Sequence, residues 1–237
     1  MGYHSIIYIF LFLPVCLFVY QLAPEKWRGR VLLGFSWIFF YLLSGKLLVY
    51  LLGTTLLTHC IGIWLTVIRM QEAKAVEGLE RKQKKAVKME YQKKGRRVLA
   101  LGIFILLGIL GYLKYFDFFT VNLSHLFGHP VLEGWRPENL LMPIGISFYT
   151  LQAIGYMTDV YWGTIQAETE IWRTALFLGF FPQIMEGPIA RYSDVADTLY
   201  TGKPLEYRNV VDGYVRIFWG LFKKMVIADR MALMVNQ

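Results

Sequence analysis

The sequence predicts an all-α, multi-pass integral membrane protein in which some helices are broken or re-entrant, and three observations support this. First, 56% of the 237 residues are hydrophobic, 16% are aromatic and the mean hydropathy is +0.41. Second, several apolar runs approach the length of about 20 residues that a helix needs to cross a bilayer. Third, prolines, glycines and charged side chains interrupt the apolar run at 176–191. This composition excludes an ordinary soluble domain.

Four apolar segments in the first half of the chain are predicted to span the bilayer. They are Ser5 to Leu22, Val31 to Leu43, Leu47 to Ile68 and Val98 to Phe119. The second is too short to cross alone, so it must recruit interfacial residues, stand nearly upright or turn back at Ser44 to Lys46. The first is interpreted as a retained helix and not as a cleaved signal peptide, because no Lys or Arg precedes it and no small-residue cleavage site follows it.

Positive charge is concentrated in one linker, residues 69–97, which holds eleven Lys and Arg against four Glu and so carries +7 of the net charge of +8. The positive-inside rule places this linker in the cytoplasm. Counting two crossings back puts the basic loop at 24–30 on the same side and the N-terminus outside. Helix-forming residues dominate the linker, which predicts a polar helix lying on anionic lipid headgroups. The flanking apolar segments disfavour nucleic-acid binding, the other interpretation of a basic run.

The sequence predicts no metal site and no bound cofactor. Turn-forming residues fill 120–139, which predicts an extracytoplasmic loop. His125 and His129 have the i, i+4 spacing of a zinc-binding pair on a helix, but Gly128 and Pro130 would break such a helix. We therefore interpret both as loop histidines. The two cysteines lie in apolar segments, where they act as small hydrophobic residues and predict no disulfide.

A polar and aromatic stripe marks the segment 140–163, in which Pro143 suits the first turn of a helix. The stripe consists of Tyr149, Gln152, Tyr156 and Asp159. These side chains share an arc of about 80° on a helix, and a helix that faces lipid has no reason to gather them. The stripe is therefore expected to face other helices or a hydrated cavity. The alternative is that Tyr149 and Gln152 only hydrogen-bond between helices, while Asp159 lies in an interfacial belt.

The interrupted run at 176–191 contains two prolines without a backbone N–H, together with Gln183, Glu186 and Arg191. Free carbonyls and charged groups are tolerated at membrane depth only where protein or water surrounds them. The run is therefore predicted to be a re-entrant bend that lines a polar site, preceded by an incomplete crossing from Ile171 to Phe181. Two alternatives remain. The helix could end at the headgroups with Glu186 and Arg191 in water, or these two could form a pair that only holds the bend.

The last segment, Glu206 to Gln237, has the pattern of a long amphipathic helix at the membrane interface. One side carries charged residues at helical spacing. The opposite side carries Val211, Val215, Phe218 and Phe222. The helical pattern continues to the last residues without a terminating glycine, proline or polar tail. We therefore expect this chain to be the N-terminal portion of a longer membrane protein.

Three blocks of residues resemble the signature of membrane-bound O-acyltransferases, in particular the alginate O-acetyltransferase branch. The blocks are Pro143 to Tyr149 with Asp159, Val160, Tyr161 and Gly163; Phe180 to Gln183 with Gly187, Pro188, Ile189 and Arg191; and Phe222 to Lys224 with Ile227, Ala228 and Asp229. Their order and spacing follow the family pattern from Leu11 to Asp229, although Glu186 stands where the pattern has a small residue. By this resemblance, residues 1–237 are the N-terminal portion of one acyltransferase domain, with 69–97 as a linker within it.

The resemblance implies an enzyme whose helices surround a tunnel through the cell membrane. Members of this family pass an acyl group from a cytoplasmic donor, such as acetyl-CoA, to a hydroxyl of an extracytoplasmic polysaccharide or an acyl-carrying partner protein. Their catalytic base is a histidine in a later membrane segment, and the four histidines of this chain do not match it. They are His4, His59, His125 and His129. No catalytic residue is therefore expected here, the histidine is expected beyond Gln237, and a protein that ends there is predicted to be inactive.

The tunnel is expected to be lined by five residues of the stripe and the bend. They are Tyr149, Gln152, Gln183, Glu186 and Arg191. Arg191 is expected to meet a phosphate or carboxylate of the donor, or to pair with Glu186. Two other functions stay open. The enzyme could instead transfer D-alanine to teichoic acid, as in a related branch. The chain could also be a non-catalytic scaffold or a transporter, because broken helices with polar residues mark transport sites as well, although no internal repeat is present.

Overall fold

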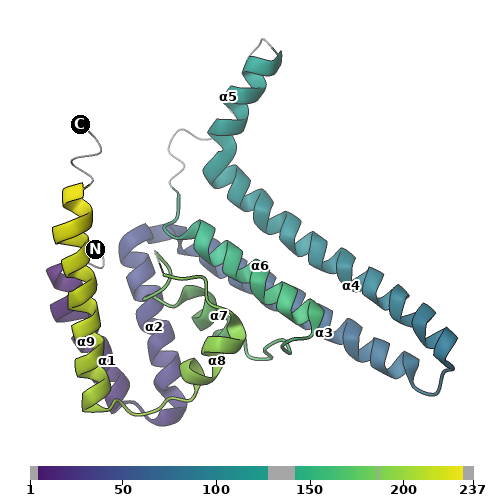
Figure 1. Cartoon of the computed structure of the whole chain (residues 1–237), viewed down its shortest axis with the longest axis horizontal. Coiled ribbons are helices and arrows are strands. Elements are labelled where there is room, and N and C mark those ends of the chain that lie inside the picture. The colour runs from purple at the N-terminus through teal and green to yellow at the C-terminus, as the bar shows by residue number, and fades with distance from the viewer. Residues whose placement is uncertain (1–4, 128–141, 186, 232–237) are drawn as a thin grey trace. The chain divides into compact units, whose positions relative to one another are not determined.

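The computed structural model describes residues 5–127, 142–185 and 187–231, which form helices, turns and loops without a β-strand. The predicted all-α class is therefore confirmed. The chain divides into two compact units, one made of residues 1–31 and 201–237 and the other of residues 32–200. The helix α2 (Glu25–Ser44) begins in the first unit and continues in the second. The two units are described separately below (Figure 1).

The first unit contains α1 (Leu13–Leu22), which follows a π-helical turn at Tyr8–Phe12, and α9 (Tyr207–Phe222), which continues as a π-helical turn at Lys223–Ala228. Its connecting segment is held by hydrogen bonds. Arg28 donates from Nη1 to the carbonyl oxygen of Gly202 over 2.6 Å, and the N–H of Leu205 donates to Oε1 of Gln21 over 2.9 Å. The α9 helix buries none of its residues, so its predicted apolar side is exposed.

The second unit is built on a long helical hairpin, the α3–α4 hairpin (Figure 1). Its helices are α3 (Leu48–Val76), α4 (Arg81–Leu110), α5 (Phe116–Phe127), α6 (Ile146–Trp162), α7 (Ile171–Gly179) and α8 (Tyr192–Tyr200). A 3₁₀ turn at Gly45–Leu47 joins α2 to α3, and a π-helical turn at Gly111–Tyr115 joins α4 to α5. The helix α6 packs against both hairpin helices, and α7 packs against α3 and α6.

Glycines allow α6 to lie close to the hairpin. A methyl group on Gly95 of α4 would lie 3.2 Å from the Tyr161 ring, and one on Gly102 would lie 3.1 Å from the sulfur of Met157. Small residues at such crossings let helix backbones approach, as in helices that pack within membranes. Large buried side chains fill the remaining space. They include Leu65, Leu106, Tyr156, Met157, Val160 and Phe177.

Two continuous helical stretches, Glu25–Val76 and Arg81–Leu126, are long and apolar enough to cross a membrane by length and composition, and Tyr8–Leu22 is a shorter apolar helix. The predicted short segment Val31 to Leu43 lies inside α2, which gains a further turn and a half from the basic residues before it. The helix is thus longer than the apolar segment, and how that segment crosses the bilayer stays a prediction.

Three local predictions were wrong. The linker 69–97 is not one helix, because α3 ends at Val76 and α4 begins at Arg81, with Gly78 in the left-handed region at φ +80° between them. The predicted loop at 120–139 begins late, because α5 continues through His125 to Phe127 and the breaking residues start only at Gly128. The rest of that loop, with His129, lies outside the described residues.

The third correction concerns the start of α6. Pro143 does not occupy its first turn, because the helix begins only at Ile146. Gly145 precedes it in the left-handed region at φ +74°, which a helical turn does not contain. Pro143 instead contributes its carbonyl oxygen, which accepts a hydrogen bond of 3.4 Å from the N–H of Ile146.

Candidate functional site

The start of α6 meets the bend that follows α7. An added methyl group on Gly145 would lie 2.0 Å from the carbonyl oxygen of Ile184, and Gly145 has a positive φ that side chains rarely adopt. Only glycine therefore fits at this junction. Two of the sequence blocks that carry the family resemblance, 143–149 and 180–191, are thus in direct contact, although more than 30 residues separate them along the chain.

The bend itself is a series of tight turns. The helix α7 ends at Gly179, and the N–H of Gln183 donates to the carbonyl oxygen of Phe180 over 3.0 Å. The N–H of Gly187 then donates to the carbonyl oxygen of Gln183, also over 3.0 Å. A methyl group on Gly187 would lie 2.5 Å from Cα of Gln183, so the turn closes only around glycine. The interruption that the sequence predicts after Phe180 is therefore present.

Two serines of α2 support the bend and the start of α6. The hydroxyl of Ser36 accepts a hydrogen bond from the N–H of Phe181 over 3.2 Å and donates to the carbonyl oxygen of Leu32 over 2.7 Å. The hydroxyl of Ser44 accepts from the N–H of Ile144 over 3.1 Å. These serines satisfy backbone groups that the interrupted helices leave unpaired, which would otherwise cost free energy where they are buried.

Gln152 links α6 to the end of α7. Its side chain is 6% exposed, and its amide Nε2 donates to the carbonyl oxygen of Phe177 over 3.0 Å. That carbonyl lies in the last turn of α7, where the N–H four residues later belongs to Phe181 and is used by Ser36. Gln152 therefore caps a carbonyl that the bend leaves without its helical partner. This is the interhelical hydrogen bond that one of the sequence alternatives described.

A pocket of about 320 Å³ lies between α6 and the segment that leaves the bend. We call it the α6–bend pocket, and its polar lining residues are Gln152, Tyr156, Thr158, Asp159, Arg191 and Tyr192, with Trp162 beside them. It combines an amide, hydroxyl groups, a carboxylate and a guanidinium. Such a set can hydrogen-bond a hydroxyl-bearing ligand from several sides, and the guanidinium can hold an anionic group.

The predicted site residues fall into different places. Gln152 and Arg191 line the α6–bend pocket together. Gln183 is half-buried within the turn. Tyr149 is 1% exposed, packs edge-on against Phe40 at 6.5 Å between ring centroids, and its hydroxyl has no hydrogen-bond partner among the described residues. Glu186 lies outside the described residues, so the predicted pair with Arg191 is not described either.

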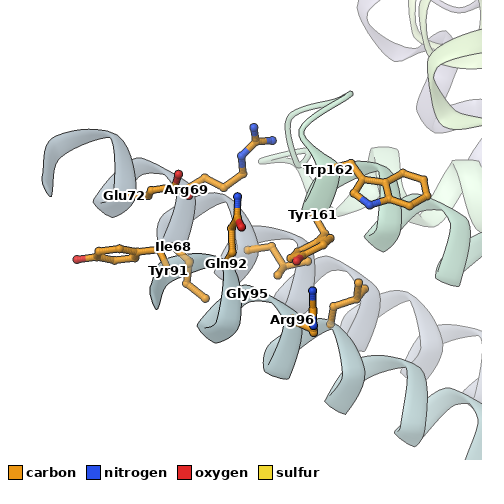
Figure 2. A pocket seen from close by; sticks show the side chains of 11 residues that line it. Ile68, Arg69, Glu72, Tyr91, Gln92, Gly95, Arg96, Tyr161 and Trp162 are labelled. Atoms are coloured by element: carbon orange, nitrogen blue, oxygen red, sulfur yellow. The ribbon is translucent and has the colours of Figure 1, made fainter. Parts of the chain in front are cut away.

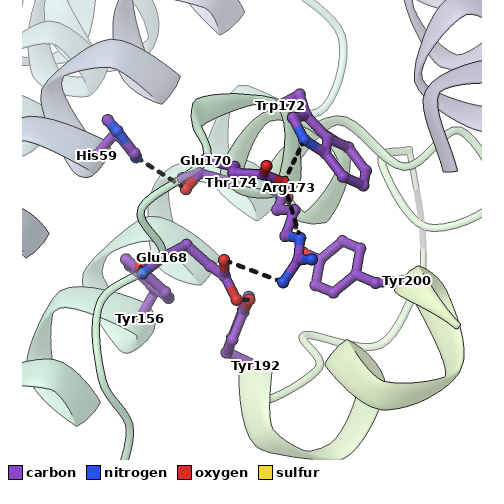
Figure 3. Close-up of polar contacts among 9 residues, drawn as sticks. All are labelled: His59, Tyr156, Glu168, Glu170, Trp172, Arg173, Thr174, Tyr192 and Tyr200. Carbon is purple, nitrogen blue, oxygen red and sulfur yellow. Dashed lines mark hydrogen bonds and ion pairs between the residues drawn. The ribbon is translucent and has the colours of Figure 1, made fainter. Parts of the chain in front are cut away.

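A network around Glu168, which the sequence analysis missed, fixes one wall of this pocket (Figure 3). The Glu168 carboxylate accepts a hydrogen bond from the Tyr192 hydroxyl and lies 3.5 Å from Nη1 of Arg173, while its backbone N–H donates to the Tyr156 hydroxyl over 2.8 Å. The Tyr200 hydroxyl donates to the carbonyl oxygen of Arg173 over 2.7 Å. Because Tyr156 and Tyr192 line the pocket, Glu168 sets the position of both.

The environment keeps the Tyr192 hydroxyl protonated. Burial, and then the hydrogen bond to the Glu168 carboxylate, raise the pKa of Tyr192 well above its ordinary value. The phenol is therefore the donor in this contact. The Tyr192 ring also packs edge-on against Tyr156 and Phe177, at 5.1 Å and 5.0 Å between centroids. The sequence offered one signal for this network, namely Arg173 inside a short apolar run, since a charge there requires a partner.

His59 is a second buried polar group in this region (Figure 3). It is 8% exposed in the middle of α3, and its Nδ1 lies 3.2 Å from the hydroxyl oxygen of Thr174 in α7. The pairing joins two helices through groups that would be costly to bury alone. His59 is absent from the lining of the α6–bend pocket, so it does not supply a base there.

Comparison with known proteins extends along the whole chain. The probable alginate O-acetylase AlgI of Pseudomonas aeruginosa is 29% identical over 236 residues, which cover 100% of this chain and 41% of that protein. The peptidoglycan O-acetyltransferase of Helicobacter pylori is 31% identical over 160 residues, 56% of this chain and 30% of the relative. The teichoic acid D-alanyltransferase of Bacillus subtilis is 31% identical over 93 residues, 38% of this chain and 24% of the relative.

The alginate O-acetylases that match this whole chain are membrane-bound O-acyltransferases. The resemblance to the alginate O-acetylase branch, inferred from three short blocks, is thereby confirmed. The chain spans about two fifths of the length of the alginate O-acetylases that it matches. No protein-family model and no solved structure matches it. Two of the blocks that carry the resemblance contribute Asp159, Ile189 and Arg191 to the lining of the α6–bend pocket.

Proposed function

We propose that the protein containing this chain is a membrane O-acyltransferase that moves an acetyl or other acyl group from a cytoplasmic donor to a hydroxyl of an extracytoplasmic polysaccharide. The observation that carries the proposal is the similarity to probable alginate O-acetylases over essentially the full chain. Acetyl-CoA is the proposed donor. In the reaction, the hydroxyl oxygen forms an ester bond to the acyl carbon, the carbon–sulfur bond of the donor breaks, and the hydroxyl proton passes through a base to the leaving thiolate.

The proposed setting is a multi-pass position in the cell membrane. The N-terminus faces outward, and the tip of the α3–α4 hairpin, which contains most of the positive charge, lies in the cytoplasm. Cysteine labelling tests this orientation in a background without Cys16 and Cys60. A cysteine placed by Lys85→Cys should react with a membrane-impermeant maleimide only after the cells are opened. Labelling in intact cells would contradict the proposal.

The α6–bend pocket is the proposed part of the substrate passage within this chain. Acyl transfer requires a base, stabilisation of the oxyanion and exclusion of water. The pocket offers donors and walls, with Arg191 suited to an anionic group of the donor and Asp159 and Gln152 suited to hydroxyl groups of the acceptor. The base is proposed to come from the family's histidine, which the histidines of this chain do not match.

The test is complementation of a bacterium that lacks its alginate O-acetylase. The natural reading frame that contains this chain should restore O-acetyl groups on secreted alginate, and residues 1–237 alone should not. In that reading frame, Arg191→Gln should lower acetylation about tenfold or more, because it removes a charge-assisted contact of about 1.5–3 kcal/mol. Arg208→Gln on the exposed face of α9 is the matched control. Equal acetylation by both variants would exclude the pocket from the reaction.

D-alanyl transfer to teichoic acid is the second candidate, favoured by the similarity to a D-alanyltransferase over 93 residues. The same strains decide between the two functions if the transferred group is identified by mass spectrometry of the released acyl acid. Acetate supports the first proposal and D-alanine supports the second. A membrane-inserted protein that transfers neither group would contradict both and support a scaffold or transporter.

A further inference from the structure

A second pocket lies between the two hairpin helices and the C-terminal end of α6 (Figure 2). Its volume is about 570 Å³, and we call it the hairpin pocket. The polar and aromatic residues that matter here are Arg69 and Glu72 of α3, Gln92 and Arg96 of α4, and Tyr161 and Trp162 of α6. It is separate from the α6–bend pocket except for Trp162, which borders both. The acyl-transfer proposal gives it no role.

The hairpin pocket lies where both long helices change from apolar to charged sequence. The apolar part of α3 ends at Ile68, and the apolar part of α4 begins at Val98. Under the topology proposed above, on which this step rests, this is the level of the cytoplasmic lipid headgroups and the adjoining water. Tryptophan and tyrosine rings such as those of Trp162 and Tyr161 favour this level, because one end of the ring is apolar and the other is polar.

Arg69 is held in place by the end of α6. Its Nη1 donates to the carbonyl oxygen of Val160 over 3.4 Å, at the end of the helix where partial negative charge accumulates. Gly163 makes room for it, since a methyl group there would lie 1.3 Å from Nη1. A guanidinium has five N–H donors, and this contact uses one. Arg69 therefore has donors left for a ligand.

The charges of the hairpin pocket favour an anion. Arg69 and Arg96 are opposed by one carboxylate, Glu72, and the amide of Gln92 adds a neutral donor. Figure 2 shows that Arg69 comes from one hairpin helix and Gln92 and Arg96 from the other. Two guanidiniums on neighbouring helices suit a tetrahedral anion with several oxygens better than they suit a single neutral group.

We propose that the hairpin pocket binds a phosphate group through Arg69 and Arg96, with Tyr161 and Trp162 against the remainder of the ligand. The phosphate has two possible sources with the same chemistry. It is either the headgroup of an anionic phospholipid or a phosphate of the soluble acyl donor. In both cases the bound phosphate would draw α3, α4 and the end of α6 together at one point.

The test is native mass spectrometry of the protein, produced from its natural reading frame and purified in detergent, titrated with phosphatidylglycerol or phosphatidylcholine. Phosphatidylglycerol should bind with a saturable first equivalent, and Arg96→Gln should weaken that equivalent about tenfold or more. Arg81→Gln is the matched control, because it removes the same charge from the same helix outside the pocket. Equal weakening by both variants would show that general surface charge binds the lipid, which would overturn the proposal.

Coenzyme A identifies the source of the phosphate. If coenzyme A binds in lipid-free detergent, displaces phosphatidylglycerol and depends on Arg96, the donor supplies the phosphate. If phosphatidylglycerol alone binds in an Arg96-dependent way, the lipid supplies it. If none of the probes depends on Arg96 in a variant with an unchanged thermal midpoint, the proposal fails. Binding is measured without turnover, so failure of the phosphate proposal would leave the acyltransferase proposal intact. In the same way, a lack of acetylation would not affect a phosphate site that binding has demonstrated.

Discussion

The α6–α8 region and the tip of the α3–α4 hairpin both carry charged side chains, but they satisfy them differently. Around Glu168, whose side chain is 17% exposed, a phenol and a guanidinium contact one carboxylate. On the hairpin, Glu90 and Lys94 form an i, i+4 ion pair of 2.8 Å in which the side chains are 63% and 51% exposed. Water solvates the hairpin pair in any conformation, whereas the carboxylate of Glu168 depends on its protein partners.

Buried charges with protein partners and exposed charges in water are suited to different roles. The buried contacts fix the walls of the α6–bend pocket, as the proposed acyl transfer requires, because small displacements of reacting groups slow a reaction. The exposed charges of the hairpin impose no single structure, and they leave cationic groups available for an external anion. The comparison is therefore tested by matched substitutions, one in each region. A substitution in the α6–α8 region should lower stability much more than its partner on the hairpin.

The largest effect is expected for Gly145→Ala. The new methyl group would lie 2.0 Å from the carbonyl oxygen of Ile184, and the positive φ adds strain. The two costs together are about 3 kcal/mol, which corresponds to a fall of roughly 6–12 °C in the thermal unfolding midpoint in detergent. Gly78→Ala is the control, since Gly78 also has a positive φ but no atoms lie near the added methyl. It should cost about 1 kcal/mol, and equal midpoints for the two variants would contradict the close contact.

Glu168→Ala should give the next largest loss. It leaves the Tyr192 hydroxyl without its acceptor, while Arg173 keeps its ion pair of 3.3 Å with Glu170, so the expected cost is about 2 kcal/mol. The midpoint of thermal unfolding measures the change. The control, Glu90→Ala, removes an equal charge from an exposed pair and should leave the midpoint unchanged. A similar decrease in both variants would mean that Glu168 is no better supported than a surface carboxylate.

Gln152→Leu should cost about 1–2 kcal/mol, because the carbonyl of Phe177 then loses its partner in a buried place. The expected readouts are a lower thermal midpoint and lower acetylation in the complementation assay, since Gln152 also lines the α6–bend pocket. Gln83→Leu on the exposed face of α4 is the control for the change in side-chain shape. Unchanged stability in Gln152→Leu would show that the capping contact is dispensable.

The smallest effect at neutral pH is expected for Tyr192→Phe, and its signature lies in alkaline solution. The pKa of this tyrosine is raised above its ordinary value of 10.0 in the folded protein. Below pH 10 this tyrosine is protonated in both the folded and the unfolded protein. Above pH 10 the unfolded chain releases the proton first, so the free energy of unfolding declines. The midpoint of the wild type should fall more steeply than that of Tyr192→Phe between about pH 9 and about pH 11. Parallel pH profiles would contradict the raised pKa.

Patterns that repeat along one helix predicted much of the fold. The apolar runs predicted the positions of α2, α3 and α4, and the prolines and glycines predicted the break after α7. The stripe predicted that Tyr149, Gln152 and Tyr156 would face other helices, where they are indeed buried. The hairpin turn at Gly78 was missed, because one glycine among helix-forming residues is a weaker signal than the composition around it.

Fewer features of the candidate functional site could be predicted from the sequence. Gln152 and Arg191 line one pocket, but the tunnel that they were expected to line stays a prediction. Glu168 was missed because its partners Arg173 and Tyr192 come from two later helices. No periodicity relates residues that meet only after three helices have packed.

The sequence alone determined the helical class, the apolar segments, the distribution of charge and the family resemblance, because these depend on residue type and on spacing within single segments. The tertiary structure alone decided which polar groups become partners. Whether Ser36 meets Phe181, or Glu168 meets Tyr192, depends on how helices pack, and packing is set by many weak contacts together. The same packing placed Gly145 against Ile184 and so brought two distant motifs into one site.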